Sequence, residues 1–194
     1  IDDEWIEKIK AKQPEFRDEK LERYKKEFDI PQYDAEILTE SKHMADIFEE
    51  TTAICGKPKK VSNWLMVETM RLLKEHGMEP EDISFSPANL AKLIGLTEDG
   101  TINSSVAKEV FEQVFEKNVD PESYVEEHGL KTVNDEGALE EVLKEVIAKN
   151  PKAIADYKGG KEKALGALVG QTMKAMKGKA NPGMVNEKLR EMLN

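Results

Sequence analysis

The sequence predicts an all-α protein, and three observations support that prediction. Aromatic residues make up only 6% of the 194 residues and charged residues 35%, a balance more typical of helices than of sheets. Apolar residues recur at the spacing of amphipathic helices, and no stretch shows a convincing strand alternation. Ser86-Pro87 and Asp120-Pro121 read as helix starts, because a capping side chain precedes proline at the first helical position.

Residues 1–130 are expected to form a helical domain. A short helix around Trp5 stops before Pro14, and a second ends at Ile30-Pro31, since proline disfavours a helical residue before it. A third helical region ends near Gly56, and the next helix ends at Gly77 in a C-cap position. Two helices then begin at the proline starts, with a regular amphipathic helix between them. The expected core positions are Leu21, Tyr24, Phe28, Ile37, Met44, Ile47, Phe48, Val61, Leu65, Leu72, Leu90, Leu93, Ile94, Val106, Val110, Phe111, Val114 and Phe115.

Residues 131–194 are expected to form a smaller helical tail domain. The segment 131–137 is polar and without period, so we expect a hinge there that proteases cut first. A strong amphipathic helix follows around Leu143, and a short helix follows Asn150-Pro151. A lysine-rich helix then lies between Gly160 and Gly178, and Asn181-Pro182 starts the last helix.

Several classes of chemistry find no support in the sequence. The single cysteine, Cys55, excludes an internal disulfide, and three widely spaced histidines lack metal-ligand spacing. The glycine spacing of a phosphate loop is absent. No apolar run approaches the length of a membrane span, and we expect no signal peptide. We therefore expect a cytoplasmic chain without a catalytic or metal site or a membrane contact; its start at Ile1 indicates a fragment or a trimmed protein.

The charge is divided unequally along the chain. The formal net charge is -10, which argues against general nucleic-acid affinity. From Lys152 onward, however, nine lysines and arginines face only four aspartates and glutamates, a surplus of five positive charges that leaves -15 for the residues before it. Such asymmetry indicates one surface that meets a polyanion and another that avoids it.

The lysine-rich helix has a distinctive face. At about 100° per residue, Lys163, Ala167, Gly170 and Lys174 form one stripe, nearly bare in the middle and cationic at both ends. A phosphate backbone could approach this stripe closely. Alternatively, Gly166 and Gly170 admit a second helix and the lysines are only solvated, which the stripe alone favours because charge runs are usually solvated faces. The opposite, apolar face is expected to contain Leu165, Leu168, Val169, Met173 and Met176.

A family resemblance rests on motifs in collinear order across nearly the whole chain. The run Tyr157-Lys-x-Gly-Lys-x-x-Ala-Leu-Gly-x-Leu-Val-Gly-Gln-x-Met-Lys, followed by Lys177-Gly-Lys-Ala-Asn-Pro182, resembles the YqeY-like tail of the GatB component of glutamine-dependent aspartyl/glutamyl-tRNA amidotransferases. Its lysine-glycine-lysine-alanine core alone is shared with free-standing YqeY proteins and with a related archaeal amidotransferase component. Further upstream, the segments 33–39, 63–66, 93–94 with 99–102, and 107–111 resemble the helical domain that precedes that tail.

The resemblance implies a role in translation. Such enzymes convert Glu-tRNA(Gln) or Asp-tRNA(Asn) to the amide form with ATP and ammonia from glutamine. The GatB component activates the carboxylate in an amino-terminal domain that holds magnesium, and its later domains grip the tRNA. This chain resembles only those later domains. We therefore expect it to bind rather than catalyse, to need no cofactor itself, and to have tRNA and the amidotransferase subunits A and C, but no DNA, as partners.

With the resemblance in view, the RNA interpretation of the stripe leads. No aromatic residue lies among the lysines to stack on a base, so the contacts are expected to position RNA rather than read its sequence. The competing interpretation is a non-catalytic helical interaction module that docks on partner subunits or a synthetase. The predicted RNA-binding residues are Lys158, Lys161, Lys163, Ala167, Gly170, Lys174, Lys177 and Lys179.

Overall fold

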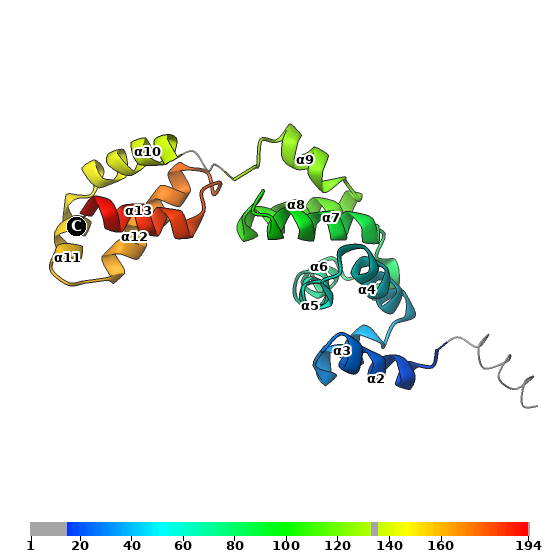
Figure 1. Ribbon diagram of the computed structural model, residues 1–194. Helices are drawn as coiled ribbons and strands as arrows, with labels where there is room; N and C mark the ends of the chain where they lie inside the picture. The colour runs from blue at the N-terminus through cyan, green and yellow to red at the C-terminus, as the bar shows by residue number, and fades with distance from the viewer. Residues whose placement is uncertain (1–14, 133–135, 194) are drawn as a thin grey trace, which may run out of the picture. The chain divides into compact units, whose positions relative to one another are not determined.

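The fold is all-α, as predicted. The computed structural model describes residues 15–132 and 136–193, and no β-strand occurs in this part of the chain (Figure 1). The helix predicted around Trp5 lies outside the described residues. The chain divides into two compact units, residues 1–91 and 92–194, each of which is described by itself below.

The first unit is a succession of helices, several of which begin or end at capping residues that the sequence shows. It contains α2 (Arg17–Glu27), α3 (Gln32–Leu38), α4 (Lys42–Cys55), α5 (Pro58–Asn63) and α6 (Met70–His76). Ser41 caps α4 by accepting a hydrogen bond from the Met44 amide at 3.3 Å. Gly56 and Gly77 end α4 and α6 with φ values of 66° and 64°, where glycine avoids the cost of a side chain.

One stretch of this unit departs from regular α-helix. The sequence predicts a single helix up to Gly77, whereas Trp64–Thr69 forms a π-helical segment, η1, between α5 and α6. The Met70 amide donates to the Leu65 carbonyl, five residues back, which is the bonding pattern of a π turn. A 3₁₀ turn, η2 (Pro80–Asp82), follows α6.

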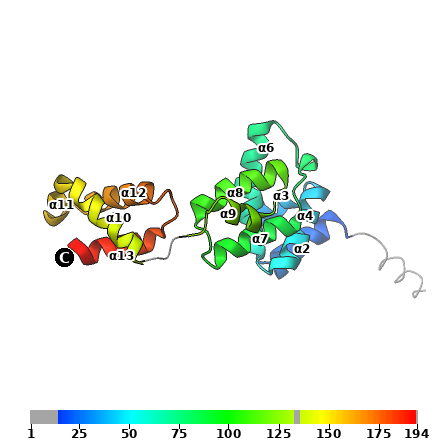
Figure 2. The ribbon, with the colours of Figure 1, turned by 90° about the horizontal axis from the view of Figure 1, so that it is seen from above.

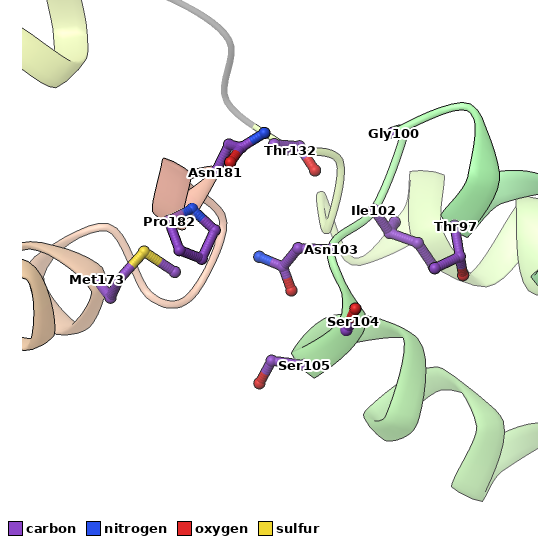
Figure 3. A pocket seen from close by; sticks show the side chains of 10 residues that line it. All are labelled: Thr97, Gly100, Ile102, Asn103, Ser104, Ser105, Thr132, Met173, Asn181 and Pro182. Carbon is purple, nitrogen blue, oxygen red and sulfur yellow. The ribbon is translucent and has the colours of Figure 1, made fainter. Parts of the chain in front are cut away.

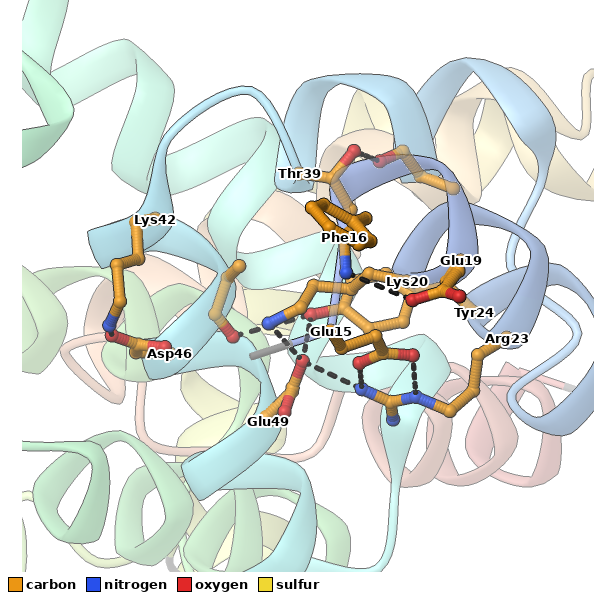
Figure 4. A network of polar contacts seen from close by, with 12 residues as sticks. Glu15, Phe16, Glu19, Lys20, Arg23, Tyr24, Thr39, Lys42, Asp46 and Glu49 are labelled. Carbon is orange, nitrogen blue, oxygen red and sulfur yellow. Dashed lines mark hydrogen bonds and ion pairs between the residues drawn. The ribbon is translucent and has the colours of Figure 1, made fainter. Parts of the chain in front are cut away.

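An aromatic cluster joins α2 to α4, and so does the network of polar contacts that Figure 4 shows. The buried Tyr24 ring lies 4.7 Å from Phe48, centroid to centroid, and its hydroxyl donates to Glu49 Oε1 at 2.7 Å. Arg23 Nη2 and Lys20 Nζ approach the same carboxylate at 2.9 and 3.0 Å. Burial opposes ionisation of Glu49, but the Tyr24 hydrogen bond and the adjacent cations outweigh it and hold its pKa below the ordinary 4.5.

The second unit begins within α7 (Pro87–Glu98), which starts at Ser86-Pro87 as predicted. Helices α8 (Ser104–Lys117) and α9 (Pro121–Glu127) follow. Their capping oxygens are those of Asn103, which accepts from the Val106 amide at 2.9 Å, and Asp120, which accepts from the Ser123 amide at 3.0 Å. The predicted start at Asp120-Pro121 is therefore confirmed.

The end of this unit is a small bundle of α10 (Glu136–Lys149), α11 (Pro151–Lys158), α12 (Lys163–Ala175) and α13 (Pro182–Leu193) (Figures 1 and 2). Helix α12 packs against all three of the others. The predicted domain boundary near residue 131 stays a prediction, and residues 133–135 of the predicted hinge lie outside the described residues. The buried residues of the bundle core are Leu139, Leu143, Val146, Leu165, Leu168, Ala180, Val185, Leu189 and Leu193.

Candidate nucleic-acid interface

Helix α12 presents its apolar face to the bundle. Leu165 and Leu168 are buried, and Val169, Met173 and Met176 pack against the same core at partial exposure, as their spacing predicts. Thr172 is also buried, and its hydroxyl donates to the Leu168 carbonyl at 2.9 Å. This packing fixes which side of the helix remains open to solvent.

The opposite stripe of α12 is uncovered. Lys163, Ala167, Gly170 and Lys174 are all exposed. A Cβ atom placed on Gly166 or Gly170 would meet no atom within 4 Å. Within the described chain, these glycines therefore make room for no other helix, and a flat, nearly side-chain-free surface separates two lysines that lie roughly 16 Å apart along the helix axis.

Most of the six predicted RNA-binding lysines form no ion pair within the described chain. Five of the six have no ion pair or side-chain hydrogen bond with any described residue: Lys158, Lys163, Lys174, Lys177 and Lys179. Lys161 instead pairs with Asp156 at 3.0 Å, an exposed contact that is easily exchanged. Lys163 occupies the first position of α12, where the positive end of the helix dipole disfavours a cation. That position weakens folding locally and strengthens the field offered to an anion.

The turn after α12 carries two more lysines on a constrained backbone. Lys177 has a φ of 52° and Gly178 one of 73°, so two successive residues adopt the left-handed conformation. The Gly178 amide donates to the Met173 carbonyl at 2.8 Å and the Lys177 amide to the Lys174 carbonyl at 3.0 Å, which closes the helix end. A lysine is costly in this conformation. Lys179 is half-buried.

Asn103 holds this turn through a second set of contacts. Its side-chain amide donates to the Gly178 carbonyl and, at 3.4 Å, to the Ala180 carbonyl. Beside it lies a hollow of about 480 Å³, with Ser104 and Ser105 on one side and Met173 on the other (Figure 3). Its lining contains hydroxyl and amide groups but no charged side chain, so it offers neither an ion-pairing group nor a carboxylate base.

A second hollow, of about 500 Å³, lies at the turn between α11 and α12. Its lining contains Tyr157, Lys158, Gly160, Glu162 and Leu193. Of these, only Lys158 belongs to the predicted RNA-binding residues. The sequence prediction missed Tyr157 and Glu162 because it considered aromatics between the lysines, whereas Tyr157 directly precedes Lys158 in the most distinctive motif of the chain.

Other kinds of site find no support among the described residues. There, no group of three or more histidines, cysteines, aspartates or glutamates is placed to hold a metal ion. In the same part of the chain, none of the helices combines the length and the apolar character needed to cross a membrane.

Comparison with known proteins gives consistent matches. The sequence profile of the GatB domain family matches residues 46–193. The GatB component of the aspartyl/glutamyl-tRNA(Asn/Gln) amidotransferase of Agathobacter rectalis is 68% identical over 193 residues, which cover 100% of this chain and 41% of that protein. The corresponding proteins from Caldicellulosiruptor bescii and Thermodesulfovibrio yellowstonii are 50% identical over 196 residues and 47% over 193, with the same coverage. The chain thus spans about 41% of the length of these curated relatives.

Proposed function

The chain belongs to the GatB domain family, and from that premise we propose that it is the tRNA-positioning part of the GatB component of an aspartyl/glutamyl-tRNA(Asn/Gln) amidotransferase. One observation carries the proposal: α12 exposes a bare stripe whose flanking lysines have no carboxylate partner in the described chain. Cations left unpaired in a chain of net charge -10 are available to an external polyanion.

The interface acts on the RNA backbone in this proposal. Each lysine that neutralises a phosphate releases condensed counterions, which supplies affinity without reading sequence. The uncovered centre of the stripe, at Ala167 and Gly170, lets the phosphates approach the helix backbone. The folded shape of tRNA then determines which RNAs can touch lysines at both ends of α12.

The decisive experiment is a salt titration of tRNA binding. Replacing Lys163 and Lys174 together by alanine should weaken binding and lower the slope of log affinity against log salt by about one to two units, since each lysine accounts for roughly 0.7 to 0.9 of a counterion. The matched control replaces Lys144 and Lys149, exposed lysines of α10 that pair with Glu140 and Glu145. Equal slopes for the test and control variants would contradict the proposal.

Gly170 tests whether the RNA touches the centre of the stripe. Because no atom lies within 4 Å of a Cβ there, Gly170→Leu should leave the bundle folded and, by helix propensity, stabilise it by about 0.5 to 1 kcal/mol. The leucine side chain should nevertheless hold phosphates away and weaken tRNA binding. A variant that is more stable and binds tRNA as tightly as the original would place the RNA elsewhere.

The roles of the rest of the enzyme are proposed from the family resemblance of the sequence. Glutamine hydrolysis, use of ATP and magnesium, and amidation of misacylated tRNA would depend on the part of the GatB component not spanned by this chain and on subunits A and C. We expect the purified chain alone to bind tRNA without amidating it. ATP-dependent amidation of a misacylated tRNA by this chain alone would refute that division of labour.

A docking role on those subunits is the second candidate, and it rests on the first unit. Tyr33, Ile54 and Val67 are 69%, 59% and 51% exposed, an unusual set of large apolar side chains in contact with water. Replacing Val67 by aspartate should weaken association with subunits A and C and leave tRNA binding by the isolated chain unchanged. The opposite pattern would assign this surface to RNA.

A further inference from the structure

The hollow at the α11–α12 turn has the composition of a nucleotide pocket. Its volume of about 500 Å³ lies within the roughly 300 to 1,000 Å³ typical of small-molecule sites. Tyr157 offers an aromatic ring, Lys158 a cation and Glu162 a carboxylate around one opening. Gly160, with a φ of 89°, turns the chain there without placing a side chain in the hollow.

Tyr157 is held in place by the bundle. It is partly buried and packs against the core formed by α10, α12 and α13, while part of its surface lines the hollow. A ring fixed on one side and open on the other loses little conformational entropy when a base stacks on it. Proteins that bind single-stranded RNA use such rings as platforms for unstacked bases.

The charges at the opening do not neutralise each other. Lys158 and Glu162 are four residues apart, both are exposed, and neither makes an ion pair with any residue in the described chain. A ligand that suits this pair needs an anionic group for the lysine and hydrogen-bond donors for the carboxylate. A nucleotide has both, because its phosphate is anionic and several bases carry N–H groups on the Watson–Crick edge.

We propose that this pocket binds one unstacked nucleotide of the RNA, with the base on Tyr157, the phosphate at Lys158 and the Watson–Crick edge at Glu162. The carboxylate favours guanine, whose N1–H and N2–H₂ groups together match its two oxygens. Cytosine and adenine present one amino group, and uracil places two carbonyl oxygens beside its single N–H. This inference rests on the proposed function and adds base selectivity to backbone contacts.

The test measures binding of nucleoside monophosphates to the full chain by amide chemical shifts in NMR spectra. GMP should shift the amides of residues 157–162 and bind at least about ten-fold more tightly than UMP. Glu162→Gln should reduce GMP affinity about ten-fold and change UMP affinity little, whereas Lys158→Ala should weaken both nucleotides alike. Equal affinity for GMP and UMP, or a Glu162→Gln variant with unchanged selectivity, would overturn the proposal.

Control variants separate binding from folding. Tyr157→Phe keeps the ring and should retain GMP binding, while Tyr157→Leu should reduce it at least about five-fold. Lys152→Ala on α11 and Glu187→Gln on α13 remove exposed charges outside the pocket and should have no effect. If tRNA binding keeps its full salt dependence but GMP shifts no amide at millimolar concentration, the nucleotide pocket is refuted and the proposed function stands. Loss of both kinds of binding refutes both.

Discussion

Lysines and arginines are used in opposite ways in the α2–α4 region and in the tail bundle. Around Glu49, Lys20 and Arg23 converge on one carboxylate, and Arg23 also forms a two-pronged contact with Glu15 at 2.8 and 2.7 Å. Along α12, Lys163 and Lys174 make no ion pair with any described carboxylate. A cation that joins two helices is committed to the fold, whereas an unpaired cation remains available to a ligand.

The largest change in stability is expected from a substitution of Glu49. Replacing Glu49 by alanine removes the closer of the two acceptors of the buried Tyr24 hydroxyl, which keeps only a backbone carbonyl at 3.4 Å, and it leaves Arg23 and Lys20 without this partner. The free energy of unfolding should therefore fall by about 2 to 3 kcal/mol. Chemical denaturation followed by tryptophan fluorescence measures this. Its exposed neighbour Glu50 is the control, and its alanine variant should change stability by less than about 0.5 kcal/mol. Equal effects at the two positions would show that the network is not stabilising.

Acid should weaken the same network, so stability should fall as the pH is lowered. The hydrogen bond from Arg23 lowers the pKa of Glu15, and that of Glu49 is also below its ordinary 4.5. A carboxylate with a depressed folded-state pKa stabilises the fold fully above pH 4.5 and loses that contribution as the pH falls through the folded-state value. Denaturation curves between pH 7 and pH 3 should therefore converge for the original chain and Glu49→Gln below pH 4.5. A constant difference across that range would contradict the assignment.

A smaller effect is expected at Lys177, where the backbone conformation favours glycine and the proposed RNA contact favours a cation. Glycine adopts the left-handed conformation without strain, so Lys177→Gly should stabilise the tail bundle by about 0.5 to 1 kcal/mol. It should also weaken tRNA binding by removing one cation. Thermal unfolding and the salt slope measure the two effects in one variant. A gain in stability with unchanged binding would exclude Lys177 from the interface.

The smallest expected effect on stability belongs to the stripe itself. Lys163→Ala with Lys174→Ala should change the free energy of unfolding by no more than about 0.5 kcal/mol, because both side chains are exposed and alanine is the better helix former. Circular dichroism during heating gives this value. A large destabilisation would mean that these lysines serve the fold as Lys20 and Arg23 do.

Local signals predicted much of the fold, because they act within a few residues. Prolines at the first helical position correctly predicted where α7, α9, α11 and α13 begin, and glycines predicted where α4 and α6 end. The π-helical turn was not predicted, since apolar spacing cannot distinguish an extra residue per turn from an ordinary irregularity. The exposed stripe was predicted from 3.6-residue periodicity alone.

Long-range contacts account for most of what the sequence did not reveal. Tyr24 and Glu49 are 25 residues apart, and no periodic pattern pairs them. Leu193 reaches the same hollow as Tyr157 only because α13 packs in the bundle. The left-handed Lys177 is a further case, because glycine is the residue expected at such a helix end.

The unpaired cations of the tail have a practical consequence for handling the protein. Its pI of about 5.0 predicts retention on an anion exchanger and none on a cation exchanger at neutral pH. If the lysines of α12 bind polyanions, as proposed, the chain should also be held by heparin or phosphocellulose. Resins of both charges should thus retain the protein. Nucleic acid carried over from the lysate should dissociate from the protein only at high salt.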